Sequence, residues 1–431
     1  MNNFEMSRRD LNVVWHPCTQ MKDHETIPLV PIRRGNGVYL EDFEGNSYID
    51  AISSWWVNLF GHCNAYINTK VKEQLDTLEH VILAGFTHES VVRLSERLVG
   101  LAPKGLTRCF YADNGSSAIE VALKMSYHSH KNSGREKPLF VSLSESYHGE
   151  TLGALSIGDV ALYKETYEPL LIRAIQTPSP EDQSEEAAWE AAKAFRTLLE
   201  TRSDEIAALI VEPLLQGAGG MRMYHPLFLR EAKALCKEFG IHFIADEILV
   251  GFGRTGSMFA CEQADITPDF LILSKGLTGG YLPLSVVLAT EEIYNSFYCD
   301  YDPARSFLHS HSYTGNALAC AAANATLDIF EKDNVIENNR VISALMGEHL
   351  KRFSGMKRVK EIRQCGMIGA IELEGFEPQE RIGLKIHQHC LTRGVMIRPL
   401  GSVIYVMPPY VITAEQLGEV FDAIESALKV I

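Results

Sequence analysis

The chain has 431 residues, of which 46% are hydrophobic and 22% charged, so it can bury a large core without disulfides or metals. Its 40 basic and 55 acidic residues leave a net charge of −15, which argues against nucleic acid or an anionic membrane as the main partner. The nine cysteines form no Cys-x-x-Cys pair and the histidines no His-Glu-x-x-His motif, so no metal site is expected. The scattered cysteines and the polar N-terminus indicate a soluble cytoplasmic protein.

The first predicted element is a β-hairpin at residues 35–50, where apolar and polar residues alternate around a turn. From about residue 90, amphipathic helices alternate with short apolar strands. The predicted strands are 107–113, 138–143, 207–213, 241–247 and 269–275. One predicted helix, 91–102, precedes them, and 115–130 and 226–239 are among the helices between them. Such strands separated by helices indicate an α/β fold with a mainly parallel sheet that is covered on both faces.

After about residue 330 the pattern changes to a long helix, short strands within 367–409 and a last helix from Thr413. This part reads as a smaller α+β domain. The N-terminal hairpin needs a partner to be stable, and we expect it to pack there. The predicted organisation is therefore an N-terminal segment (1–60) packing with the small domain, a large α/β domain (61–330) and a C-terminal small domain (331–431).

Polar residues follow the predicted strands at the edge where ligands of open parallel sheets bind. Gly115 and Ser116 open a helix whose free N–H groups suit an anion, although a helix capped by Ser116 or Ser117 explains them equally simply. Asp246 ends an apolar strand, where an acid needs a cation, a ligand or loop amides as partner. Lys275 ends another strand, where a lowered pKa would make its amine a nucleophile.

An anion cradle, a buried acid and a lysine at one sheet edge together suit a phosphorylated pyridine aldehyde. In that hypothesis Lys275 forms a Schiff base, Asp246 keeps the pyridine nitrogen protonated and the helix terminus holds the phosphate. Residues 251–256 match Gly-x-Gly-x-x-Gly, which leaves a nicotinamide enzyme as one alternative. A non-catalytic ligand-binding or scaffolding protein is another.

Four further residues could contribute to a site. Tyr147 follows a strand and could stack on a heterocycle, unless it is an ordinary loop tyrosine. Trp55 and Trp56 are adjacent, so one ring could line a cavity while the other packs in the core. Arg398 is a planar donor suited to a carboxylate, or the partner in a surface salt bridge.

Several motifs match one known family. They include YADNGSSAIEVALKM (111–125), SYHGET (146–151), ADEILVGFGRTG (245–256) and LSKGLTGG (273–280). With these motifs, the chain resembles the class III aminotransferases of pyridoxal phosphate fold type I, and the likeness extends from residue 15 to residue 409. The resemblance implies a large domain with a mainly parallel sheet, a small domain built from both chain ends, and pyridoxal 5′-phosphate as cofactor.

The resemblance also implies roles for matching residues. Lys275 corresponds to the Schiff-base lysine, Asp246 to the partner of the pyridine nitrogen and Tyr147 to the ring-stacking residue, and these three are the expected catalytic residues. The other expected cofactor-binding residues are Gly115, Ser116, Glu212, His311 and Ser312. The expected substrate-binding residues are Cys18, Trp55, Ser310 and Arg398, together with Tyr147 and Lys275. In this fold type the segment 310–312 reaches towards the phosphate of a second subunit, which implies a homodimer.

The implied reaction is a ping-pong transamination. Within the family, the likeness points to amination of 8-amino-7-oxononanoate to 7,8-diaminononanoate in biotin synthesis, with S-adenosylmethionine as amino donor. Lysine as donor, or another omega-amino substrate, is the alternative. Cys18 stands where relatives that use S-adenosylmethionine usually have tyrosine, and residues 310–312 differ from the frequent Gly-Pro-Thr, so the chain departs from these relatives at two places.

Overall fold

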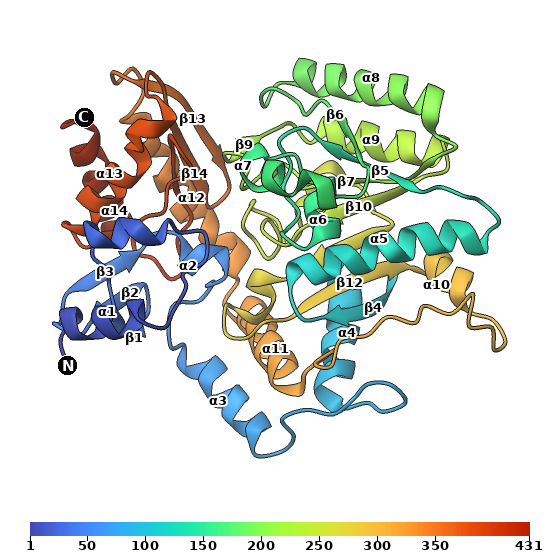
Figure 1. Cartoon of the computed structure of the whole chain (residues 1–431). Helices are drawn as coiled ribbons and strands as arrows, with labels where there is room; N and C mark the ends of the chain where they lie inside the picture. Colours follow the sequence, from blue (N-terminus) through green and yellow to red (C-terminus); the bar gives the residue numbers. More distant parts are fainter.

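The structure, a computed structural model, describes all residues from 1 to 431. Figure 1 shows two lobes. The large lobe is built on a seven-stranded sheet, and in the small lobe the N-terminal strands lie beside C-terminal strands and helices. No helix of the chain has the length and apolar character needed to cross a membrane.

The sheet of the large lobe has the strand order β4-β12-β11-β10-β7-β5-β6. The five adjacent strands β11, β10, β7, β5 and β6 run parallel to one another, which confirms the expected mainly parallel sheet. By contrast, β12 runs antiparallel to both β11 and β4, which the sequence analysis did not anticipate. The strand bounds are Leu106–Ala112 (β4), Leu139–Leu143 (β5), Ile175–Thr177 (β6), Ile206–Val211 (β7), His242–Asp246 (β10), Phe270–Leu273 (β11) and Ser285–Thr290 (β12).

Side chains of this sheet alternate between two apolar cores, because successive residues of a strand point to opposite faces. In β10, Phe243 and Ala245 join the core on one face, whereas Ile244 joins the core on the other. The first core contains α4 (Glu89–Leu101), α8 (Glu185–Arg202), α9 (Leu227–Glu238) and α11 (Ala317–Lys332). The second contains α5 (Gly115–Asn132), α6 (Leu152–Ile157) and α10 (Glu291–Phe297). The sheet is thus covered on both faces.

The small lobe has a core of its own, to which both ends of the chain contribute, for example through Val38 and Ile404. β3 pairs in parallel with β15, with Ile49 opposite Val395. The division of the chain at residues 60 and 330 stays a prediction. The elements are β1 (Ile32–Asn36), β2 (Tyr39–Asp42), β3 (Ser47–Asp50), α12 (Val335–Lys351), β13 (Val359–Cys365), β14 (Ile368–Leu373), α13 (Ile382–Leu391), β15 (Val395–Met396), β16 (Val403–Val406) and α14 (Ala414–Leu428).

A short link joins the two lobes near the C-terminal third of the chain. α11 ends at Lys332 and α12 begins at Val335, with Asn334 between them in the left-handed conformation (φ 47°). The remaining elements are α1 (Asn3–Leu11), η1 (Met21–Glu25), α2 (Ser53–Trp56), α3 (Ala65–Leu75), α7 (Ala161–Lys164), η2 (Glu165–Leu170), β8 (Leu215–Gln216), β9 (Arg222–Met223), η3 (Ala260–Ala264), η4 (Lys275–Thr278) and η5 (Pro378–Glu380).

Candidate active site

A cavity of about 630 Å³ opens at the carboxyl edge of the large sheet. Five strands end at it, and each one either ends in or leads into a lining residue. These residues are Asn114 after β4, Tyr147 after β5, Glu212 after β7, Asp246 at the end of β10 and Lys275 after β11. The structure therefore brings together side chains that are up to 161 positions apart, as the strand-end argument requires.

Lys275 is the first residue of η4 and has a left-handed backbone (φ 44°), which side-chain-bearing residues rarely adopt. Its Nζ lies 4.4 Å from the centre of the Trp56 ring and forms no ion pair. Burial lowers the pKa of the amine to about 8, although the charges of Asp246 and Glu212 oppose the shift. A far larger fraction of this lysine than of an ordinary one is therefore neutral near physiological pH, as a nucleophile or proton acceptor requires.

Asp246 has two defined partners although it is only 5% exposed. Its Oδ2 lies 2.8 Å from Nδ1 of His148, and its Oδ1 accepts the N–H of Ile248 at 3.1 Å. Nε2 of His148 is buried without a partner. The adjacent Glu247 instead accepts the N–H groups of two residues of η3, so the loop-amide explanation holds for Glu247, while Asp246 lines the cavity.

The N-terminus of α5 presents free N–H groups to the cavity. Asn114 caps the helix, its Oδ1 accepting the N–H of Ser117 at 3.0 Å, so the expectation of a serine cap was wrong. Gly115 and Ser116 line the cavity, and their N–H groups precede the first intrahelical bond. Gly149 approaches so closely that a Cβ atom there would lie 1.9 Å from Oγ of Ser116, so the loop after β5 needs this glycine where it meets the start of α5.

Tyr147 is fixed at both its main chain and its hydroxyl. Its N–H donates to Oε1 of Glu212 at 2.9 Å, and its hydroxyl donates to Glu150 at 2.9 Å. Burial raises the pKa of Tyr147, with a further contribution from Glu150. Burial also raises the pKa of Glu212 to about 7, because His148 and the N–H bonds from Tyr147 and Gly217 offset it only in part. Glu212 thus holds the loop that carries the Tyr147 ring into the cavity.

The two tryptophan side chains occupy different places. The backbone is left-handed at four consecutive residues (53–56), which points the two side chains in different directions. Trp56 is 4% exposed, and its Nε1 donates to the hydroxyl of Tyr405 at 3.0 Å. Trp55 is 37% exposed at the mouth of the cavity. Both residues line the cavity, where the sequence led us to expect one of the two, and it is Trp56 that contacts Lys275.

Arg398 lies outside the cavity lining and makes no salt bridge. Its guanidinium stacks on the Trp55 ring at 4.8 Å and donates to the main-chain oxygen of Cys18 at 2.9 Å. Cys18 itself lines the cavity, and burial raises the pKa of its thiol. These three residues form one side of the cavity mouth.

The segment 310–312 also lies outside the cavity lining of its own chain. Ser310 and Ser312 are exposed, and Nδ1 of His311 lies 3.6 Å from Oδ2 of Asp113. The main-chain oxygen of Ser312 lies 2.8 Å from Nε2 of His80. The structure therefore places these residues beside the start of α5 but not in the cavity.

The glycine-rich segment 251–256 opens no crossover helix, since the next helical element is the five-residue η3. Within it, Arg254 is 1% exposed and donates to the main-chain oxygens of Pro408 and Asn58 and to Oγ of Ser53. This segment joins the two lobes, and the structure gives the nicotinamide alternative no support.

An amine with a lowered pKa, a buried carboxylate and free helix N–H groups around one cavity define a site for covalent capture of an anionic carbonyl compound. The sequence model of the family Aminotransferase class-III matches residues 20–428. The chain belongs to this family, which confirms the resemblance found in the sequence.

Individual relatives are similar over nearly the whole chain. The adenosylmethionine-8-amino-7-oxononanoate aminotransferase of Helicobacter pylori is 53% identical over 423 residues, covering 96% of both chains. A crystal structure of the enzyme of the same name from Methanocaldococcus jannaschii has a TM-score of 0.96 at 37% identity, covering 100% of this chain and 99% of the other. A PLP-bound amine transaminase from an uncultivated Pseudomonas species has a TM-score of 0.92 at 29% identity, covering 97% and 98%.

Two residues of the site went unassigned in the sequence analysis, although each carried a signal. His148 directly follows Tyr147 after a strand end, but a single histidine in a loop is more often structural. Glu150 lies three residues after Tyr147 and brings a carboxylate into the cavity wall. The partner of His148 is Asp246, at the end of β10, which no local pattern indicates, whereas Glu150 meets the Tyr147 hydroxyl within the loop after β5.

Proposed function

We propose that this chain is a pyridoxal phosphate-dependent aminotransferase that converts 8-amino-7-oxononanoate to 7,8-diaminononanoate in biotin biosynthesis, with S-adenosylmethionine as amino donor. Support comes from the class-III family match and from relatives at 36–53% identity that carry the name of this activity. The observation that carries the proposal is the position of Lys275, a buried amine without an ion-pair partner that lines the same cavity as Asp246.

The residues present fit pyridoxal phosphate. Lys275 offers an amine without a carboxylate partner to an aldehyde, and Asp246 offers a carboxylate to a protonated ring nitrogen. The unpartnered N–H groups of Gly115 and Ser116, at the positive end of the α5 dipole, suit a phosphate. When bound, pyridoxal phosphate supplies the carbon that accepts the amino group and an electron-poor ring that takes up negative charge.

The chain's own residues position and move protons in this reaction. Nζ of Lys275, once neutral, would take the proton from the α-carbon of the donor and pass it on to the cofactor carbon that accepts the amino group. In the second half-reaction it would move a proton in the opposite direction, onto the ketone carbon of the substrate. Asp246 keeps its orientation through His148 Nδ1 and the N–H of Ile248. Tyr147, held by Glu212 and Glu150, presents its ring to the cofactor, and Trp56 restricts the access of water to Lys275.

Arg398 takes the carboxylate of the keto substrate in this proposal. Its guanidinium has five N–H donors, and the bond to the Cys18 oxygen and the Trp55 stack leave several of them free. Trp55 and Cys18 line the same mouth and contact substrate there. The exposed position of Arg398 allows it to meet a substrate before the reacting end enters the cavity.

We further propose a homodimer in which residues 310–312 complete the partner's site at the phosphate end. The chain on either side of this segment carries large exposed apolar side chains, with Tyr301 94%, Leu308 78% and Tyr313 62% exposed. Such a concentration of apolar surface is typical of a protein interface.

All nine cysteines are free thiols, which supports a reducing compartment such as the cytoplasm.

The experiment is to mix the holoenzyme with S-adenosylmethionine and 8-amino-7-oxononanoate and to identify the product by mass spectrometry. The expected product is 7,8-diaminononanoate, formed only when both substrates are present. Amination of other ketones, with the oxononanoate left unchanged, would contradict the substrate while leaving the family intact. Sedimentation of the purified protein as a monomer at micromolar concentration would contradict the dimer.

A further inference from the structure

A second cavity, of about 360 Å³, lies between the two lobes and shares no lining residue with the cavity described above. It is formed where α3 begins, where α11 ends and where α12 begins, and the segment after β16 closes it. Its volume is within the range of about 300–1,000 Å³ that is usual for small-molecule sites. The apolar part of its wall includes Phe60, Ile329, Val335 and Tyr410. The Tyr410 hydroxyl donates to the main chain of Phe252, so the ring is what Tyr410 offers to a ligand.

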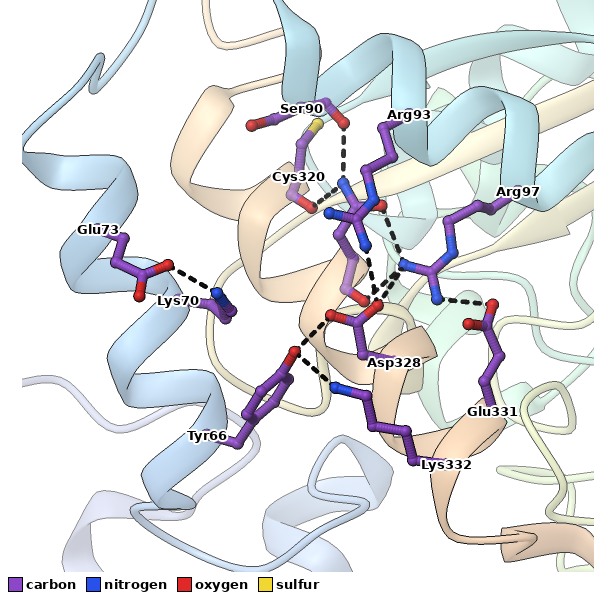
Figure 2. A network of polar contacts seen from close by, with 11 residues as sticks. Tyr66, Lys70, Glu73, Ser90, Arg93, Arg97, Cys320, Asp328, Glu331 and Lys332 are labelled. Atoms are coloured by element: carbon purple, nitrogen blue, oxygen red, sulfur yellow. Dashed lines mark hydrogen bonds and ion pairs between the residues drawn. The ribbon is translucent and has the colours of Figure 1, made fainter.

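Lys332 brings an uncompensated positive charge to this cavity. Figure 2 shows the Tyr66 hydroxyl between Asp328 and Lys332. Nζ of Lys332 lies 3.1 Å from that hydroxyl and 4.5 Å from the ring centre, and it forms no ion pair. Asp328 is already bound by Tyr66, Arg93 and Arg97. The Lys332 ammonium therefore remains available to a carboxylate.

Asp333, the next residue, brings the opposite charge to the same wall. Its side chain forms no salt bridge or hydrogen bond, whereas its main-chain N–H donates to Ile329 and its main-chain oxygen accepts from the side chain of Asn338. A third polar residue, Asn339, is 4% exposed, and its Nδ2 has no hydrogen-bond partner. Asn339 also borders a neighbouring hollow of about 370 Å³ on the same helix. A buried amide donor without an acceptor is unfavourable, and a ligand oxygen would relieve it.

We propose that this cavity binds a small zwitterion, an α-amino acid with an apolar side chain. Its carboxylate would lie at Lys332, within reach of the Asn339 amide, its ammonium at Asp333, and its side chain against Phe60 and Tyr410. The site bridges the lobes, because Lys332 ends α11, Asp333 belongs to the link and Asn339 lies in α12. The proposal goes beyond transamination and does not depend on which substrates the other cavity takes.

The test is isothermal titration calorimetry of the borohydride-reduced holoenzyme with L-norleucine, since reduction removes amine exchange at the first cavity. Hexanoate and pentylamine serve as probes that lack the ammonium or the carboxylate. We expect saturable binding of norleucine that weakens about tenfold in Lys332→Met and in Asp333→Asn. Asp333→Asn should leave the binding of hexanoate unchanged. Lys351→Met, which removes an exposed charge at the other end of α12, is the matched control and should bind norleucine like the parent.

Three results would overturn the site: no saturable binding of norleucine, equal binding to the parent and to both variants, or equal affinity for norleucine, hexanoate and pentylamine. Lys332 and Asp333 are exposed, so their replacement should leave the fold intact, and circular dichroism checks this. Because the readout is binding and not turnover, failure here would not affect the proposed aminotransferase reaction.

Discussion

Nδ1 of His148 lies 2.8 Å from Oδ2 of Asp246, and both side chains are almost completely buried. The contact joins the loop after β5 to the end of β10, two segments 98 positions apart in the chain. Together with the N–H of Ile248, it fixes the carboxylate that meets the cofactor ring in the proposed reaction. His148 is therefore a positioning residue that acts through Asp246.

Replacing His148 by Phe keeps a flat ring but removes the hydrogen bond to Asp246. A hydrogen bond to a charged group contributes about 1.5–3 kcal/mol, so the affinity for pyridoxal phosphate should fall at least about tenfold. Titration of the apoenzyme, followed by absorbance, measures it. His130→Phe removes another buried histidine, bonded to a main-chain oxygen on β7, and should leave this affinity unchanged. Equal losses in both variants would show that the effect of His148 is only structural.

The rate of cofactor capture should depend on the ionisation of Lys275. Burial lowers the pKa of this amine to about 8, and only the neutral amine attacks an aldehyde. Capture should therefore slow about tenfold for each pH unit below 8 and level off above it. Stopped-flow absorbance of apoenzyme mixed with pyridoxal phosphate at pH 6–10 gives the profile. A midpoint near 10.5, the ordinary lysine value, would contradict the described environment of Lys275.

Arg398→Ala should chiefly impair the half-reaction with the keto substrate. The lost charge-assisted contact corresponds to about 1.5–3 kcal/mol, and the exposure of Arg398 favours the lower end. The KM for 8-amino-7-oxononanoate should rise about tenfold, while conversion of the cofactor by the donor changes less. Because Arg398 also binds the Cys18 oxygen, Arg398→Lys serves as a control that keeps the charge without the planar fork. Equal damage to both half-reactions would assign Arg398 to both substrates or to structure.

S-Adenosylmethionine should convert the cofactor to its pyridoxamine form in a single turnover, and lysine should do so more slowly or not at all. The aromatic rings of Trp55 and Tyr147 at the cavity suit a sulfonium cation and an adenine ring. Loss of the cofactor absorbance band with each amine in turn is the measurement. Rapid conversion by lysine alone would replace the proposed donor, while the family assignment would stand.

Much of the site followed from the sequence because the chemistry lies at strand ends. The apolar strands that end in Asp246 or lead into Lys275 can be recognised in the sequence. Parallel strands must bring their carboxyl ends to one edge of the sheet. The antiparallel β12 escaped notice, because the apolar run within residues 282–289 gives no sign of strand direction. The direction and place of β12 in the sheet depend on its pairing with β4 and β11, and this pairing exists only once the sheet has formed.

Contacts between loops that are distant in the chain could not be predicted from the sequence either. Trp55 and Trp56 look alike in the chain, and only the left-handed backbone at residues 53–56 decides that Trp56 faces Lys275. The tie between Arg398 and Cys18 spans 380 positions and carries no local pattern. The site residues that the sequence named are brought to one cavity, except Arg398 at its mouth and residues 310–312 outside it.

Lys275→Ala should abolish turnover while the protein folds and keeps some affinity for the cofactor through the N-terminus of α5 and Asp246. The lysine provides both the amine that captures the cofactor and the proton acceptor, so its loss removes two functions at once. Thermal unfolding and the rate of amination measure the two aspects. Amination near the rate of the parent would show that another group moves the proton.

The central claim is that Lys275 captures the cofactor, and borohydride reduction of the holoenzyme tests it most directly. Reduction makes the bond between lysine and cofactor permanent, and peptide mass spectrometry then locates the added mass. We predict a pyridoxyl phosphate adduct on the peptide that contains Lys275, no adduct on that peptide in Lys275→Ala, and loss of activity in proportion to labelling. An adduct found mainly on another lysine, or full activity after complete labelling of Lys275, would contradict the account.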